Sequence, residues 1–175
     1  MPNTDRRKRK GADASVNSLW DVARIEPGSR SGLRIRIHPG VHPFVRRELL
    51  TYGRWLRASY AFPVRVNVYI PNALKIRASD GELCWGRLLW TGEMADPAII
   101  DVAGGRKEAE KQALQNHVWA TIFTLTHELS HYFQRLKGVE LTPRGTEWQA
   151  TFWAHRVMDE YYEAEWDGID DWEAE

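Results

Sequence analysis

Two runs of alternating apolar and polar residues, separated by one amphipathic stretch, constrain the fold of this chain most. Apolar residues occupy every second position over residues 33–37 and again over 64–70, which predicts two strands. Between them, residues 44–60 carry an apolar stripe at helical spacing, and Pro63 ends that element. A strand, a helix and a strand in this order favour parallel strands joined by a right-handed crossover.

The rest of the chain predicts more strands and then helices. After a loop region over residues 71–81, residues 83–90 and 98–102 are β-prone. A long helix is predicted from about residue 107 to 137, with Gly138 as its left-handed stop. This order of elements predicts an α+β fold, a small mixed sheet packed on helices.

A last helix follows, and two starting points are compatible with the sequence. Thr146 and Gln149 would form a capping box for a helix over residues 147–165. Alternatively, Thr142 caps the helix and Pro143 lies in its first turn. The residues alone leave both starts open.

Length and charge predict one domain between two charged ends. The 175 residues suffice for one core, and the net charge of zero combines a basic run at residues 6–10 with an acidic end that has no Lys or Arg after Arg156. We expect a flexible arm over residues 1–18, the domain over 19–166 and an acidic tail over 167–175.

The sequence favours a cytoplasmic protein. Cys84 is the single cysteine, so neither an intrachain disulfide nor a cysteine zinc site is expected. The basic start has no apolar stretch behind it, unlike a secretory signal. No segment approaches the roughly 20 apolar residues that span a bilayer.

The predicted long helix contains the motif H-E-x-x-H, formed by His127, Glu128 and His131. Residues four apart lie about 40° apart around a helix and one turn apart along it, so both imidazoles can reach one metal ion. Glu128 lies about 100° from His127, where it can contact a metal-bound water. This pattern indicates a Zn²⁺ site with Glu128 as general base.

A catalytic zinc usually has three protein ligands and one position for water. The extended motif with Gly and a third His would need them at positions 134 and 137, which hold Gln134 and Lys137. Glu147, 16 residues after His131, is the predicted third ligand, because small residues at 150, 151 and 154 would let its helix approach closely. Weaker candidates are Glu140, Asp159 and Glu160.

These residues carry a resemblance to a known family. Residues 124–133, Thr-Leu-Thr-His-Glu-Leu-Ser-His-Tyr-Phe, and residues 147–154, Glu-Trp-Gln-Ala-Thr-Phe-Trp-Ala, resemble the gluzincin-type metallopeptidases and most closely the ImmA/IrrE-like family. Ser130 stands where that family often has glycine. The resemblance implies a minimal zincin domain that hydrolyses peptide bonds, and a bacterial or phage source would suit it.

The resemblance also implies where a substrate would lie. In zincin-like folds an extended protein or peptide substrate runs along an edge strand, here within residues 82–90 or 98–102, where Trp85 and Trp90 could line a groove or lie in the core. A second donor for the developing oxyanion is expected. His155 is our candidate, with Tyr132, Tyr161 and Tyr162 as alternatives.

Two other functions are compatible with the sequence. One is a DNA-associated protease similar to the SprT-like family, recruited to nucleic acid by the basic arm, although such proteases generally use a third histidine. The other is a binding module that keeps a zincin scaffold without catalysis. The oligomeric state is left open by the sequence.

Overall fold

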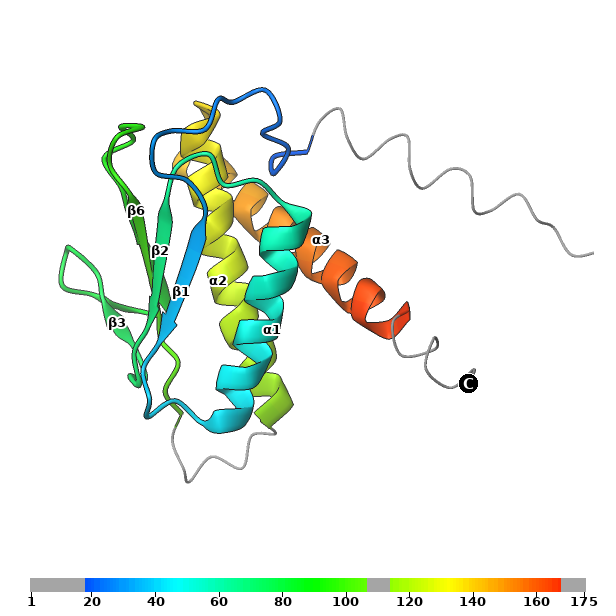
Figure 1. Ribbon diagram of the computed structural model, residues 1–175. Coiled ribbons are helices and arrows are strands. Elements are labelled where there is room, and N and C mark those ends of the chain that lie inside the picture. The colour runs from blue at the N-terminus through cyan, green and yellow to red at the C-terminus, as the bar shows by residue number, and fades with distance from the viewer. Residues whose placement is uncertain (1–17, 107–113, 168–175) are drawn as a thin grey trace, which may run out of the picture.

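A computed structural model describes residues 18–106 and 114–167 of the chain. Within these ranges two helices pack against one face of a small mixed sheet, and the third helix packs on the second (Figure 1). The predicted combination of helices with a small mixed sheet is therefore confirmed. Residues 1–17 of the predicted arm, residues 168–175 of the predicted tail and residues 107–113 of the predicted long helix lie outside the described residues.

The first two strands form the predicted parallel pair. β1 (Leu33–Ile37) and β2 (Val66–Ile70) run in parallel, with Leu33 opposite Val66. The second strand begins at Val66, two residues later than predicted. The connecting helix α1 (Pro43–Ser59) buries Val45, Leu49, Tyr52 and Leu56 of its apolar stripe at 0% exposure. His42 Nδ1 accepts the Phe44 N–H at its N-terminus.

The sheet order β1-β2-β6-β5 was not apparent from the sequence. β6 (Ala98–Val102) pairs in parallel with β2, and β5 (Gly86–Leu89) pairs antiparallel with β6 at the edge. Residues 98–102 are thus an interior strand, which corrects their assignment as a candidate edge.

Two further strand expectations also require correction. The predicted strand over residues 83–90 is divided between β4 (Leu83–Cys84) and β5, which belong to different sheets. The predicted loop over residues 71–81 contains β3 (Ile76–Arg77), which pairs with β4 in a small antiparallel hairpin.

Helix α2 (Leu114–Leu136) lies in the core and ends as the sequence predicted. Its stripe of Ile122, Leu125, Leu129 and Phe133 is buried at 0–1% exposure. Gly138 has φ 61°, and the N–H of Val139 donates to the Gln134 carbonyl at 2.9 Å. This bond closes a Schellman motif at the C-terminus of the helix.

Helix α3 (Pro143–Asp167) begins at the earlier of its two predicted starts. Thr142 Oγ1 accepts the Gly145 N–H at 3.1 Å, and Pro143 occupies the first turn, where no N–H is needed. The capping box at Thr146 and Gln149 is therefore wrong, and Glu147 lies in the second turn. No helix in the described ranges is long and apolar enough to cross a membrane.

Candidate metal centre

The two motif histidines lie on the face of α2 that the core does not cover. Both imidazoles are half-buried, while the neighbouring Leu129 and Ser130 are buried in the core. The Nε2 atoms of His127 and His131 lie 3.1 Å apart, and their ring planes are nearly perpendicular at 84°. The four-residue spacing thus brings both ring nitrogens to one point, as predicted.

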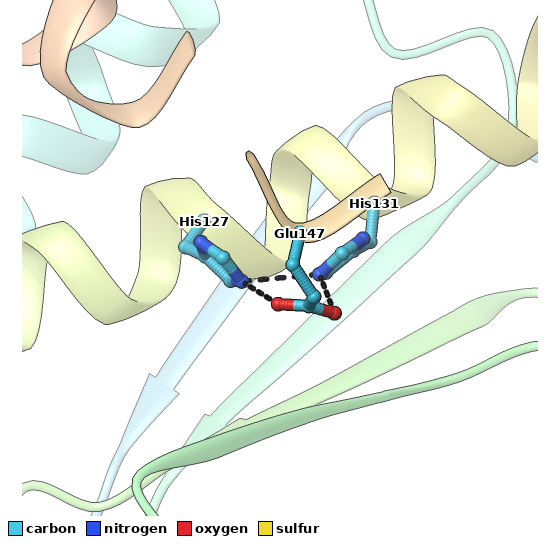
Figure 2. Close-up of side chains that lie close together, drawn as sticks. All are labelled: His127, His131 and Glu147. Atoms are coloured by element: carbon cyan, nitrogen blue, oxygen red, sulfur yellow. Dashed lines mark hydrogen bonds and ion pairs between the residues drawn. The ribbon is translucent and has the colours of Figure 1, made fainter. Parts of the chain in front are cut away.

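Glu147 approaches the same point from α3 (Figure 2). Its Oε2 lies 3.1 Å from His127 Nε2, and its Oε1 lies 3.3 Å from His131 Nε2. Ala150 and Ala154 are fully buried, so the small residues do face the interior and let α3 approach α2. Glu140, the nearest competing carboxylate in sequence, is exposed in the connection between the helices and is not part of this group.

The geometry of this donor set fits a zinc ion. Two ligands that each lie about 2.05 Å from a tetrahedral zinc are separated by roughly 3.3 Å. The three donor groups lie at 3.1–3.3 Å from one another, and each offers a nitrogen or oxygen that zinc accepts. Glu147 remains 64% exposed, which leaves one side of the group open to solvent.

A buried glutamine orients one of the histidines. The Gln134 side-chain N–H group donates to the Thr146 carbonyl at 2.9 Å, which fixes the orientation of its amide. Its Oε1 therefore accepts a hydrogen bond from His131 Nδ1 at 2.8 Å. With its proton on Nδ1, the neutral His131 ring presents the lone pair of Nε2 to a metal.

The other histidine has a more distant neighbour and a perturbed pKa. Thr151 Oγ1 lies 3.5 Å from His127 Nδ1. Burial lowers the pKa of His127 below 6.5, and the nearby His131 lowers it further, while the Glu147 carboxylate acts in the opposite direction. Burial therefore favours the neutral imidazole, which is the form that binds a metal.

Glu128 lies beside the histidines, against the edge strand. An added Cβ on Gly86 of β5 would lie 3.2 Å from Glu128 Oε1 and 3.1 Å from its Cγ, so a larger residue here would crowd this carboxyl group. Burial raises the pKa of Glu128 to about 7, with a further contribution from the Glu147 carboxylate.

The site opens onto a cleft of about 490 Å³ between α2 and the edge strand β5. Residues 86–88 of β5 line one side, and the motif residues with Arg135 line the other. Neither of the two candidate groove tryptophans lines this cleft: Trp85 is 60% exposed, whereas Trp90 is 8% exposed and belongs to the core.

The candidate oxyanion donors lie elsewhere. His155 is exposed and packs on Phe123 with ring centroids 4.9 Å apart, so an aromatic ring separates it from His127, and it does not line the cleft. The Tyr132 hydroxyl is buried and donates to the Val64 carbonyl, which assigns it a structural role. Tyr161 is buried against Tyr52, and Tyr162 likewise does not line the cleft.

Three contributors to the site were missed by the sequence analysis. Gln134 served only to exclude the three-histidine motif, although its position three residues after His131 is a signal that it can reach that ring. No sequence signal identified Gly86 or Arg135. Gly86 packs against Glu128 of α2, and Arg135 of α2 donates to the Trp90 carbonyl, so both contacts join segments distant in sequence.

Comparisons with protein-family models, curated proteins and solved structures find no match to this chain.

Proposed function

We propose that this protein is a zinc-dependent peptidase in which His127, His131 and Glu147 hold the ion. The observation that carries the proposal is the convergence of three donor groups from α2 and α3, 3.1–3.3 Å apart, beside a cleft. Three protein ligands with one open side are typical of catalytic rather than structural zinc sites.

When bound, zinc would polarise a substrate carbonyl and lower the pKa of a coordinated water. Glu128 supplies the proton transfer: a carboxyl group with a pKa of about 7 can accept a proton from water and later donate it to the leaving amine. Arg135 contributes positive charge to the same cleft. These side chains form a set suited to hydrolysis of an amide.

The edge strand supports a peptide as substrate. Among the described strands β5 pairs only with β6, so its other side is available to an extended chain through main-chain hydrogen bonds. Because β5 also lines the cleft, a peptide paired there would pass the histidines. The resemblance to gluzincin-type peptidases agrees with this arrangement.

Metal analysis combined with three substitutions tests the proposal. We expect stoichiometric zinc in the purified wild type and in Glu128→Gln, and its loss in His127→Ala and Glu147→Ala. Hydrolysis of a peptide library, followed by mass spectrometry, should be abolished in all three variants. Full hydrolysis by Glu128→Gln would contradict the proposal, and a zinc-binding wild type without hydrolysis would favour the non-catalytic binding module.

The DNA-associated alternative finds less support. A SprT-like site would need a third histidine at the metal, but His155 packs on Phe123, whereas Glu147 lies at both imidazoles. The basic arm lies outside the described residues, so recruitment through it is a separate hypothesis. Deleting residues 1–10 and measuring DNA affinity at several salt concentrations would test it, and an unchanged, weak affinity would dismiss it.

A further inference from the structure

The charges of this chain are segregated, although they sum to zero. Residues 27–79 contain ten basic residues and only one acidic residue, Glu48. Nine of the ten are arginines, and the exception is Lys75. This segment includes β1, α1 and β2, which form one edge of the sheet and the helix beside it (Figure 1).

Three of these arginines line one pocket. It has a volume of about 420 Å³ and lies where β1 and β2 begin and α1 ends. Arg34 comes from β1, Arg57 from the last turn of α1, and Arg65 directly precedes β2. Among the described residues no aspartate or glutamate lines this pocket, so none of them neutralises the positive charge of its wall from within.

The guanidinium groups are available to a ligand. Arg34 and Arg57 are exposed, and neither has a hydrogen-bond or ion-pair partner among the described residues. Arg65 uses its Nε to donate to the Ser31 carbonyl at 2.6 Å, which positions the group and leaves its terminal nitrogens for other acceptors. A planar guanidinium can donate two parallel hydrogen bonds to the oxygens of one phosphate, whereas the ammonium group of lysine acts as a point charge.

The remainder of the pocket wall is largely apolar. Leu33 and Phe62 are buried at 4–5% exposure, and Ile25 and Pro63 also line the pocket. A ligand that fits both the arginines and the apolar wall combines anionic groups with an apolar group. The volume lies within the range of about 300–1,000 Å³ typical of small-ligand sites.

We propose that this arginine pocket binds single-stranded nucleic acid, with phosphates on Arg34, Arg57 and Arg65 and a base against the apolar wall. A concave pocket can receive an unstacked base, whereas the bases of a duplex are held inside the helix. β1 and β5 are opposite edges of the sheet, so a strand bound here leaves the metal cleft open. The proposal does not depend on zinc.

Fluorescence anisotropy with the full chain tests the proposal. The probes are a labelled 12-nucleotide DNA strand, its RNA equivalent and the matching duplex, measured at several salt concentrations with and without zinc. The test variant is Arg34→Gln/Arg57→Gln. The matched control is Arg47→Gln/Arg54→Gln, which removes the same charge from α1 residues that do not line the pocket and already contact Glu48 and Thr51.

We expect the wild type to bind single strands more tightly than the duplex. The test variant should lose about tenfold or more in affinity. Its salt slope, the slope of log affinity against log salt concentration, should fall in magnitude by about 1.4, because two phosphate contacts are removed. The control should change little. Arg34→Lys/Arg57→Lys should keep the salt slope but lose affinity, since it keeps the charge without the paired donors.

Several outcomes would overturn the proposal. They are an equal loss in test and control variants, equal affinity for duplex and single strand, or displacement of the probe by polyglutamate at the same charge concentration. Thermal melting of each variant checks that the fold is kept. A failure of these tests says nothing about the metal centre, because the two sites share no residue.

Discussion

At the scale of single residues, the buried Gln134 amide links α2 and α3, the two helices that carry the proposed metal ligands. Its oxygen accepts a hydrogen bond from His131 Nδ1, and its nitrogen donates one to the carbonyl of Thr146, the residue that precedes Glu147. It also donates to Gln149 Oε1 at 3.0 Å. One side chain therefore orients one proposed ligand, His131, and holds the backbone next to another, Glu147.

Gln134→Met should weaken zinc binding while preserving the fold. Methionine has a similar length but can neither accept from His131 nor donate to Thr146, and loss of such supporting hydrogen bonds typically costs about 10–100-fold in metal affinity. Competition with a chromophoric chelator measures the zinc affinity of each variant. Gln149→Met, which removes a single bond to Gln134, is the control and should change the affinity less. An unchanged zinc affinity in Gln134→Met would show that Gln134 does not support the proposed metal site.

Glu128 should make the stability of the metal-free protein depend on pH. Its pKa rises from 4.5 to about 7 in the fold, so the folded state binds this proton more tightly than the unfolded state. The stabilisation is complete below pH 4.5 and is lost as the pH rises through 7, by at most about 3 kcal/mol.

Glu128→Gln should remove this dependence. The unfolding free energy of the variant, relative to wild type, should increase between pH 4.5 and 7. Urea unfolding in EDTA across that range measures the difference. The lowered pKa of His127 acts in the opposite direction, but His127 is present in both proteins and its contribution largely cancels in the comparison. A difference that is constant with pH would show that the Glu128 carboxyl is not perturbed.

At the scale of elements, the cleft depends on a close approach of β5 to α2. A Cβ on Gly86 would lie 2.6 Å from Thr124 Cγ2 as well as against Glu128. Gly86→Ala should therefore destabilise the protein by about 1–3 kcal/mol, as other overpacking substitutions do.

Thr124→Ser should partly restore stability in the Gly86→Ala background, because it removes the methyl group that clashes. Chemical unfolding of the two single variants and the double variant gives the coupling energy. Additive effects would indicate that β5 and α2 are further apart than this packing implies.

The start of α3 gives a second prediction at this scale. Thr142→Ala removes the side-chain oxygen that caps the Gly145 N–H and should cost about 1 kcal/mol. Thr146→Ala, at the rejected start, should be neutral or slightly stabilising, because alanine is the better helix former. Thermal or urea unfolding of both variants decides between the two starts, and the opposite ranking would favour the later one.

At the scale of the whole molecule, the proposed metal site would add a further link between α2 and α3, which already pack on each other. A ligand that binds only the folded state stabilises it by about 4 kcal/mol at a thousandfold excess over its Kd. For a domain of this size, that corresponds to a rise in Tm of about 8–16 °C. We expect this rise on adding zinc to EDTA-treated protein, measured by calorimetry, and no rise in His127→Ala. Equal rises in both would indicate zinc binding elsewhere.

The two candidate sites of this molecule lie at opposite edges of one sheet. The metal cleft adjoins β5, and the arginine pocket lies at the start of β1. Between them, the helices and the covered sheet face form one hydrophobic core. This separation would allow a peptide and a nucleic-acid strand to bind at the same time.

The sequence by itself determined the features that depend on short spacings. Apolar residues two apart predicted β1 and β2, and residues three and four apart predicted the buried stripe of α2. The same spacing brought His127 and His131 to one point. Glu147 was also predicted, because few carboxylates follow the motif at the start of a helix with small neighbours. The patterns behind the two strands, the buried stripe and the paired histidines are periodic, so a linear sequence displays them fully.

The tertiary structure alone decided the order of the strands, the edge position of β5 and the environment of each side chain. Nothing local distinguishes Trp85 from Trp90, yet one is exposed and the other is core. The packing of Gly86 against Thr124 and the bond from Gln134 to the Thr146 carbonyl likewise join residues 12 or more positions apart. Such contacts depend on how whole elements pack, because burial and hydrogen bonding are shared among distant segments, and no spacing within one segment records them.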